Sequence, residues 1–221
     1  MSPYLRSRRK RALDLLAVLV LGLVSAPVVG IAILLVRLES PGHPIYRQRR
    51  VGRDGVPFEL YKLRTMVSGA ERIGLGMAVD EGDDRITRVG AWLRRMSIDE
   101  LPNLLNIARG EMSLVGPRPT LQAQVDRYTD HQRRRLDARP GLTGWAQVNG
   151  RASLPWAERI ELDIWYIEHA SLRLDLRIIA RSFHMALTGH GLYRGETGGW
   201  REPPRKPPGG AAAGGRDGSP A

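Results

Sequence analysis

The longest hydrophobic stretch of the chain lies close to its start. Residues 12–36 are apolar except for Asp14, Ser25 and three glycine or proline positions. As a helix, a stretch of this length can cross a hydrocarbon core of about 30 Å. It lacks the small-residue cleavage site that ends a secretory signal, and the apolar run continues to Val36. We therefore expect residues 1–38 to form a basic N-terminus followed by a membrane helix.

Basic residues flank this stretch on both sides. Five lie between positions 6 and 11, and five more lie between positions 37 and 53. Because basic residues favour the cytoplasmic side, both flanks are expected there, which a single span does not allow. Pro27 lacks a backbone donor and can kink the helix, where the Ser25 hydroxyl can bond a freed carbonyl. We expect a re-entrant helix-break-helix with its membrane break at Ser25 and Pro27. A kinked single span is the alternative.

The remaining pattern predicts an α+β fold that is mostly helical. Residues 45–51 and 56–66 are typical of two strands, and Asp54-Gly55 between them is a hairpin signal. Lys62 lies on the second of these strands. Helical spacing predicts helices over residues 86–96, 101–108, 121–136, about 153–169 and 175–188, with glycine-rich loops at 67–84 and 139–151. Residues 39–199 form the expected second domain. Residues 200–221, rich in Pro, Gly, Ala and Arg, are expected to be a disordered tail.

Composition narrows the chemistry. The chain has 221 residues, 42% of them hydrophobic, and a net charge of +11, which suits either nucleic acid or an anionic membrane surface. The hydrophobic stretch favours the membrane. The absence of cysteine excludes disulfides, thiolate zinc sites and cysteine nucleophiles, and no two of the five histidines are spaced H-x-x-x-H. The sequence has no P-loop and no G-x-G-x-x-G. Carboxylates, arginines and lysines must therefore carry any reaction.

The most informative hexapeptide runs from Ser97 to Pro102 and holds two adjacent carboxylates, Asp99 and Glu100, at a predicted helix start. Backbone donors and the helix dipole are expected to keep both ionised. An ionised carboxylate can attack phosphorus, and its neighbour can bind a magnesium ion that also bridges substrate phosphates. The alternative is structural: Ser97 and Glu100 fit a capping box, which is the simpler interpretation of this hexapeptide alone.

Two further motifs combine proline, glycine and arginine. Prolines on both sides of Arg118 can pre-organise its guanidinium for phosphate, or merely form a rigid turn. Residues 139–145 carry glycines that allow close backbone approach, and Trp145 offers a ring for stacking, for a membrane-interface anchor, or simply for core packing. The arginine run 133–135 is expected to be a solvated face, with lipid headgroups as the alternative partner.

In this order, the motifs resemble those of the bacterial sugar transferases, the monotopic phosphoglycosyl transferases that begin exopolysaccharide, O-antigen or glycoconjugate assembly. The resemblance extends from about residue 10 to residue 187. It rests on Lys10-Arg11-x-x-Asp14, Ser40-Pro41-Gly42, and residues 61–66, 84–90, 97–103, 113–119 and 139–151. One departure is the Ser25-Ala26-Pro27 sequence, where the family usually has Ser-Pro.

The resemblance implies a reaction and a place for it. A sugar-1-phosphate would move from a UDP-sugar to undecaprenyl phosphate with release of UMP, on the cytoplasmic face of a bacterial inner membrane, with interfacial amphipathic helices and anionic lipids at the surface. Asp99 matches the nucleophile that carries a covalent phosphosugar, and Glu100 matches the Mg²⁺ ligand. The matched substrate-binding residues are Lys62, Arg94, Arg118, Arg151 and Asp175. The short chain is expected to be the minimal catalytic form.

Two other functions are weighed against this one. A nucleic-acid-binding protein would explain the charge but not the hydrophobic stretch, so no nucleic-acid partner is expected. A non-catalytic, basic, membrane-anchored scaffold would explain both, and it would leave Asp99, Glu100 and Arg118 free to vary. Neither the transferred sugar nor the oligomeric state follows from the motifs, so a homodimer stays open.

Overall fold

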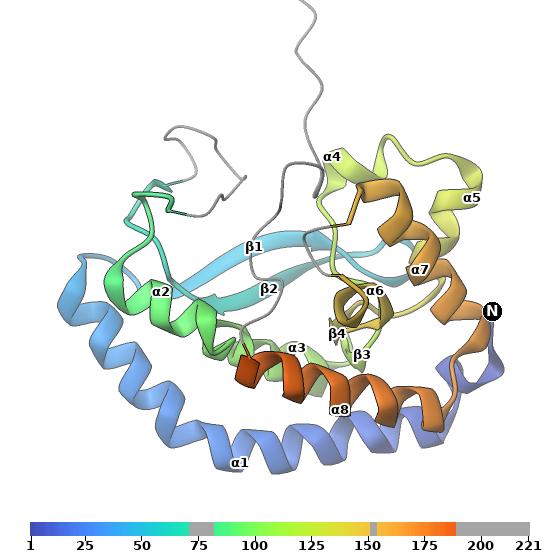
Figure 1. Ribbon diagram of the computed structural model, residues 1–221, viewed down its shortest axis with the longest axis horizontal. Helices are drawn as coiled ribbons and strands as arrows, with labels where there is room; N and C mark the ends of the chain where they lie inside the picture. The colour runs from blue at the N-terminus through green and yellow to red at the C-terminus, as the bar shows by residue number, and fades with distance from the viewer. Residues whose placement is uncertain (71–81, 151–153, 189–221) are drawn as a thin grey trace, which may run out of the picture.

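The computed structural model describes residues 1–70, 82–150 and 154–188 (Figure 1). The expected tail at 200–221 and much of the expected loop at 67–84 lie outside these residues. From residue 88 onward, the elements are α2 (Arg88–Arg95), η4 (Ile98–Asn103), α3 (Leu104–Arg109), β3 (Ser113–Val115), α4 (Gln122–Val125), α5 (Asp130–Arg133), η5 (Arg134–Asp137), β4 (Gly141–Thr143), α6 (Trp145–Val148), α7 (Trp156–His169) and α8 (Leu172–Thr188).

A short 3-10 helix, η1 (Pro3–Arg6), leads into α1 (Arg8–Glu39), a single helix of 32 residues. Over the described residues, α1 is the one helix long and apolar enough to cross a membrane. Its most apolar 18 residues have a mean hydropathy of 2.7, and only 6% of this segment is buried inside the protein. The helix continues through Pro27, so the expected break is not present in the structure.

Within the described residues, α1 is buried against other elements only near its two ends. Lys10 and Asp14 are buried near its start, and Ala32 and Val36 near its end. Large apolar side chains between them are exposed, and Leu23 is 72% exposed. In Figure 1 the helix runs beneath α8 and then rises toward α2, so that both ends meet the same body.

The predicted hairpin is confirmed. β1 (Ile45–Val51) and β2 (Pro57–Leu63) pair antiparallel from Ile45↔Leu63 to Val51↔Pro57. The turn between them contains η2 (Arg53–Gly55), in which Asp54 adopts φ 57° and Gly55 adopts φ 78°. β2 ends earlier than expected because Met66 leaves the hairpin and forms an isolated bridge with Ile86.

Two predictions about the second half of the chain are wrong. The helix expected over 121–136 is divided into α4, α5 and η5, because Thr129 and Gln132 form a capping box that starts a new helix. The loop expected at 139–151 contains β4 and α6. β4 pairs in parallel with β3, which lies far away in sequence, so no local pattern reveals it.

Hydrophobic side chains from distant segments form the core. The largest cluster joins the hairpin, α3, β3, α7 and α8, and Ile107, Tyr166 and Ile178 within it are fully buried. A separate cluster packs Val36 of α1 against Leu63 and Leu93. The end of α1 is therefore part of the same packed body as the hairpin and α2.

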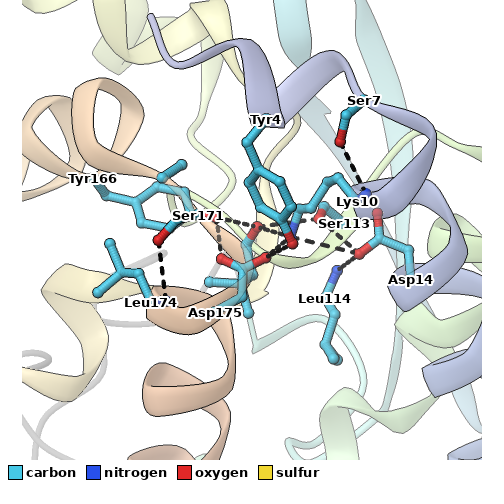
Figure 2. A network of polar contacts seen from close by, with 12 residues as sticks. Tyr4, Ser7, Lys10, Asp14, Ser113, Leu114, Tyr166, Ser171, Leu174 and Asp175 are labelled. Carbon is cyan, nitrogen blue, oxygen red and sulfur yellow. Dashed lines mark hydrogen bonds and ion pairs between the residues drawn. The ribbon is translucent and has the colours of Figure 1, made fainter.

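Beside the core, a buried polar network joins α1 to α8 (Figure 2). Lys10 Nζ lies 2.7 Å from Asp175 Oδ2 and donates to the Val115 carbonyl at 3.0 Å. Tyr166 donates to Asp175 Oδ1 at 2.7 Å, and Tyr4 donates to Oδ2 at 3.0 Å. Burial, reinforced by the Asp175 charge, raises the pKa of both tyrosines well above the usual range, so both hydroxyls remain donors at neutral pH.

Asp14 extends this network toward β3. Its Oδ1 accepts hydrogen bonds from the Ser113 hydroxyl and the Leu114 amide, each at 2.9 Å, and lies 3.6 Å from Lys10 Nζ. The Asp14 side chain is fully buried within the protein. Protein donors therefore satisfy Oδ1 at the start of the hydrophobic stretch, whereas no described group bonds the buried Oδ2.

Candidate active site

The two adjacent carboxylates lie in η4, immediately after a sharp turn at Ser97. Ser97 adopts the left-handed conformation, with φ 56° and ψ 22°, and its side chain makes no capping hydrogen bond. The capping-box interpretation is therefore wrong. A serine in this conformation is uncommon, and such strained residues concentrate at functional sites.

Glu100 is held by two cations from different elements. Its Oε1 lies 2.7 Å from Lys62 Nζ of β2 and 3.1 Å from Arg118 Nη2. The Glu100 side chain is 20% exposed. Burial opposes ionisation, but the charges of Lys62 and Arg118 outweigh it and hold the Glu100 pKa well below its usual range. Glu100 is thus a fixed anion.

Asp99 has a different environment although it is the next residue. Its side chain is 9% exposed and receives no hydrogen bond from the described residues. Burial raises its pKa to about 6, assisted by the Glu100 charge and opposed by Lys62, Arg94 and Arg118. The expectation that both acids stay ionised therefore holds for Asp99 only above about pH 6. An ionised, unbonded carboxylate among cations is suited to nucleophilic attack on an anionic phosphoryl group.

Backbone packing between two motifs fixes Arg118. A Cβ added at Gly116 would lie 2.3 Å from the Arg139 carbonyl, and one at Gly141 or Gly144 would lie 2.1 Å from backbone atoms of Gly116. Gly116 also donates to the Thr143 carbonyl at 2.9 Å. The glycines of residues 139–145 therefore bring two backbones together, and this contact holds the turn from which Arg118 extends.

A buried ion pair supports the same turn from the other side. Arg135 lies 2.7 Å from Asp163 and donates to the Arg118 carbonyl at 3.1 Å. Its side chain is 3% exposed, whereas Arg133 and Arg134 are exposed, so the solvated face expected of this arginine run is confirmed for those two residues and wrong for Arg135. Two nearby arginines add positive charge that sequence reasoning missed: Arg50 acts electrostatically on Arg118 and Glu100, and Arg159 acts on Arg118 and Arg135. Burial, with this repulsion, lowers the pKa of each to about 10.

The four other candidate residues have different outcomes. Arg94 Nε donates to Thr65 at 2.9 Å, and its charge reaches Asp99, so it belongs to the cluster. Asp175 does not contact that cluster, because both its oxygens are bonded in the network of Figure 2. Arg151 lies outside the described residues. Trp145 stacks on Trp165 at 5.1 Å between ring centroids and packs against the main core.

The carboxylate pair also fits a magnesium ion in its donor chemistry. No cluster of three or more His, Cys, Asp or Glu ligands occurs in the described part of the chain. Mg²⁺ is nevertheless often held by one or two carboxylates together with substrate phosphates. Both hydrogen bonds to Glu100 end on Oε1, and within the described residues none ends on Oε2 or on Asp99.

Comparisons with known proteins agree with the motifs. The sequence model of the family described as bacterial sugar transferase matches residues 5–189. A UDP-glucose:undecaprenyl-phosphate glucose-1-phosphate transferase of Caulobacter vibrioides is 47% identical over 193 residues, or 84% of this chain and 72% of that protein. The sugar transferase EpsL of Bacillus subtilis is 41% identical over 84% of this chain and 90% of its own length. A UDP-N-acetylgalactosamine-undecaprenyl-phosphate N-acetylgalactosaminephosphotransferase of Aeromonas hydrophila is 40% identical over 82% of this chain and 44% of its own.

The raised pKa of Asp99 predicts a pH-dependent cost in stability. Because the pKa of about 6 in the folded protein exceeds the ordinary aspartate value of 3.8, folding binds a proton between these values, and stability falls as pH rises through them. We expect Asp99→Asn to raise the free energy of unfolding at pH 7.5 by up to about 3 kcal/mol, and the gain to shrink as pH falls from 6 toward 3.8. Denaturant titrations at several pH values measure this difference.

The control is Asp54→Asn at the exposed hairpin turn, where no gain is expected. Glu100, whose lowered pKa acts in the opposite direction, is present in all three proteins and does not produce the difference. Equal stability of Asp99→Asn and wild type at pH 7.5 would contradict the prediction.

Proposed function

The chain belongs to the bacterial sugar transferase family, and we propose that it transfers a sugar-1-phosphate from a UDP-sugar to undecaprenyl phosphate with release of UMP. The observation that carries this proposal is the Asp99 carboxylate, which is buried beside Lys62, Arg94 and Arg118 and receives no hydrogen bond from the described residues. The printed names of the Caulobacter and Aeromonas relatives describe such transfers to undecaprenyl phosphate. In this proposal the product begins exopolysaccharide, O-antigen or other glycoconjugate assembly.

In the first half-reaction, an oxygen of Asp99 attacks the β-phosphorus of the UDP-sugar. The bond from that phosphorus to the bridging oxygen breaks, UMP leaves with the electron pair, and the sugar phosphate remains on Asp99 as an acyl phosphate. Glu100 is unsuited to this role, because Lys62 and Arg118 already neutralise it. The two neighbouring acids therefore take different parts.

In the second half-reaction, a phosphate oxygen of undecaprenyl phosphate attacks the phosphorus of the acyl phosphate. The bond to Asp99 breaks, and its carboxylate is regenerated. Donor and acceptor thus use the same cationic surroundings in turn. Attack of one anion on another requires positive charge to stabilise the transition state, and Lys62, Arg94 and Arg118 supply it. Glu100 would hold a magnesium ion, which when bound would supply further charge neutralisation.

We propose that α1 enters and leaves the membrane on the cytoplasmic face. Both its ends pack against one body, whereas a straight span of about 30 Å of hydrocarbon would separate them. The exposed apolar middle of α1 and the basic residues on both flanks support the same arrangement. A re-entrant helix holds the site at the headgroup level, where the phosphate of a polyprenyl acceptor lies.

A non-catalytic membrane scaffold is the alternative function. A scaffold would not require Asp99, an ionisable acid to which no group in the described part of the chain donates a hydrogen bond, next to a second acid held by two cations. The transferred sugar is open, because the relatives' names specify glucose, N-acetylgalactosamine and galactose. Mixing detergent-solubilised protein with a panel of UDP-sugars, magnesium and polyprenyl phosphate, and measuring UMP, identifies the donor and tests catalysis.

Asp99→Asn should abolish the covalent step, because it keeps the shape of the side chain and removes its charge. We expect wild type incubated with donor alone to gain one sugar-phosphate mass on the peptide containing Asp99, with two-substrate kinetics that give parallel double-reciprocal lines. The variant should form no adduct and lose at least about a thousandfold in turnover. Intact-peptide mass spectrometry and a UMP assay measure both.

Glu100→Gln is the matched comparison, because it removes the adjacent charge and leaves Asp99 in place. It should lower the rate and weaken the dependence on magnesium without eliminating the adduct. If Asp99→Asn kept a tenth of wild-type turnover, with deamidation excluded, direct transfer in a ternary complex would replace the covalent mechanism.

Removal of divalent ions provides a separate prediction. Because the dyad offers carboxylate oxygens and no histidine or cysteine cluster, we expect EDTA to abolish UMP release and Mg²⁺ to restore it. Zn²⁺ should restore far less. Full activity after exhaustive chelation would exclude a metal requirement.

The topology proposal is testable in this cysteine-free chain. Cysteines at the exposed positions Arg6 and Val56 should both react with a membrane-impermeant maleimide only from the cytoplasmic side. A cysteine at Leu23, exposed in the protein but within lipid in this proposal, should react from neither side. Labelling of positions 6 and 56 from opposite sides would restore a single span.

A further inference from the structure

A second cationic cavity lies at the turn of the hairpin, apart from the carboxylate pair. It has a volume of about 290 Å³ and lies between η2 and the C-terminal end of α3. Neither Asp99 nor Glu100 lines it, and Lys62 lies at the other end of β2. Its lining includes Arg53, Arg109, Arg139, Glu111, Val56 and Phe58.

The positive charge of this cavity is only partly compensated. Arg53 pairs with Asp54 at 3.1 Å, and the Glu111 carboxylate accepts a hydrogen bond from Asn106 at 2.7 Å. The Arg139 guanidinium is partly buried and has no hydrogen bond or ion pair with any group in residues 1–70, 82–150 or 154–188. Arg139 is therefore a cation without a counter-ion in the described structure.

The backbone brings a further arginine to the same place. Gly110 ends α3 with φ 82°, and a Cβ built there would lie 3.9 Å from Nη2 of both Arg11 and Arg139. Arg11 is fixed by hydrogen bonds to the carbonyls of Ile107 and Ala108, each at 2.7 Å. Burial, together with repulsion from Arg53 and Arg11, lowers the pKa of Arg139. An anion at this position would relieve the repulsion.

We propose that the cavity bounded by Arg53, Arg109 and Arg139 binds a phosphate group. A guanidinium donates two parallel hydrogen bonds to phosphate oxygens, which suits the unpaired Arg139. The apolar side chains of Val56 and Phe58 also line the cavity and would accommodate the carbon skeleton that carries the phosphate. The phosphate belongs either to a membrane lipid headgroup or to a soluble phosphate. Both present the same oxygens to the arginines.

A local fluorescence probe tests this proposal. Val56 is 63% exposed and lines the cavity, so Val56→Cys can carry an environment-sensitive dye in this cysteine-free protein. The protein in maltoside detergent is titrated at constant ionic strength with inorganic phosphate and, separately, with short-chain phosphatidylglycerol. A dye on Glu161→Cys, on the exposed surface of α7, controls for nonspecific effects.

We expect a saturable change at position 56 and none at position 161. Arg139→Gln should weaken binding by about tenfold or more, as expected for loss of a hydrogen bond to a charged group. Arg53→Gln, at the exposed turn, should also weaken it and serves if Arg139→Gln does not fold. The exposed Arg173→Gln on α8, and Arg118→Gln at the carboxylate pair, should leave the titration at position 56 unchanged.

The two ligands distinguish the source of the phosphate. Tighter binding of phosphatidylglycerol than of inorganic phosphate supports a lipid headgroup site, and the reverse order supports a soluble phosphate. The proposal is overturned if neither ligand gives a saturable change at position 56, or if the folded Arg139→Gln and Arg53→Gln proteins bind as wild type does.

Discussion

The buried ion pair between Lys10 and Asp175 links the long apolar helix α1 to the rest of the protein. Removing two charges from water is costly, and the cost is offset only where hydrogen bonds satisfy both partners. Here Tyr4 and Tyr166 donate hydrogen bonds to the Asp175 carboxylate, and the Val115 carbonyl accepts one from the Lys10 ammonium. Val115 directly precedes Gly116, at the turn that carries Arg118. One continuous set of contacts therefore runs from the start of α1 to an arginine of the candidate active site.

Local signals in the sequence were sufficient for the elements that depend on neighbouring residues. The hairpin follows from two strand-like segments joined around Asp54-Gly55, and α3 ends at Gly110 as expected. Features that depend on distant partners were not predictable. β4 exists because β3 lies beside it, and the glycines of residues 139–145 are needed because another backbone approaches within van der Waals distance. The periodicity of residues 121–136 did not reveal that Thr129 would interrupt the helix.

In the candidate site, too, the contacts that depend on distant residues could not be predicted from the sequence. Sequence motifs named Lys62, Glu100 and Arg118, and the structure joins all three through one carboxylate oxygen. The resemblance also grouped Asp175 with them, but its two oxygens are committed to Lys10, Tyr4 and Tyr166. Asp175 thus positions elements of the fold. No sequence rule reveals that Asp175 pairs with the buried Lys10 and does not join the candidate site. That pairing depends on packing between residues more than 160 positions apart.

The asymmetry of the dyad is the feature that connects stability with chemistry. The turn at Ser97, in a strained left-handed conformation, leads into a 3-10 helix in which successive side chains point in different directions. One acid meets two cations and becomes a fixed anion. The other is buried beside that anion, where ionisation is unfavourable. If stability were the only constraint, we would expect Asp99 to be exposed to water, protonated, or satisfied by hydrogen bonds. Instead, the packed network behind Arg118 keeps Asp99 where ionisation of its carboxylate is unfavourable, and in the proposed reaction the bond to phosphorus would remove that charge.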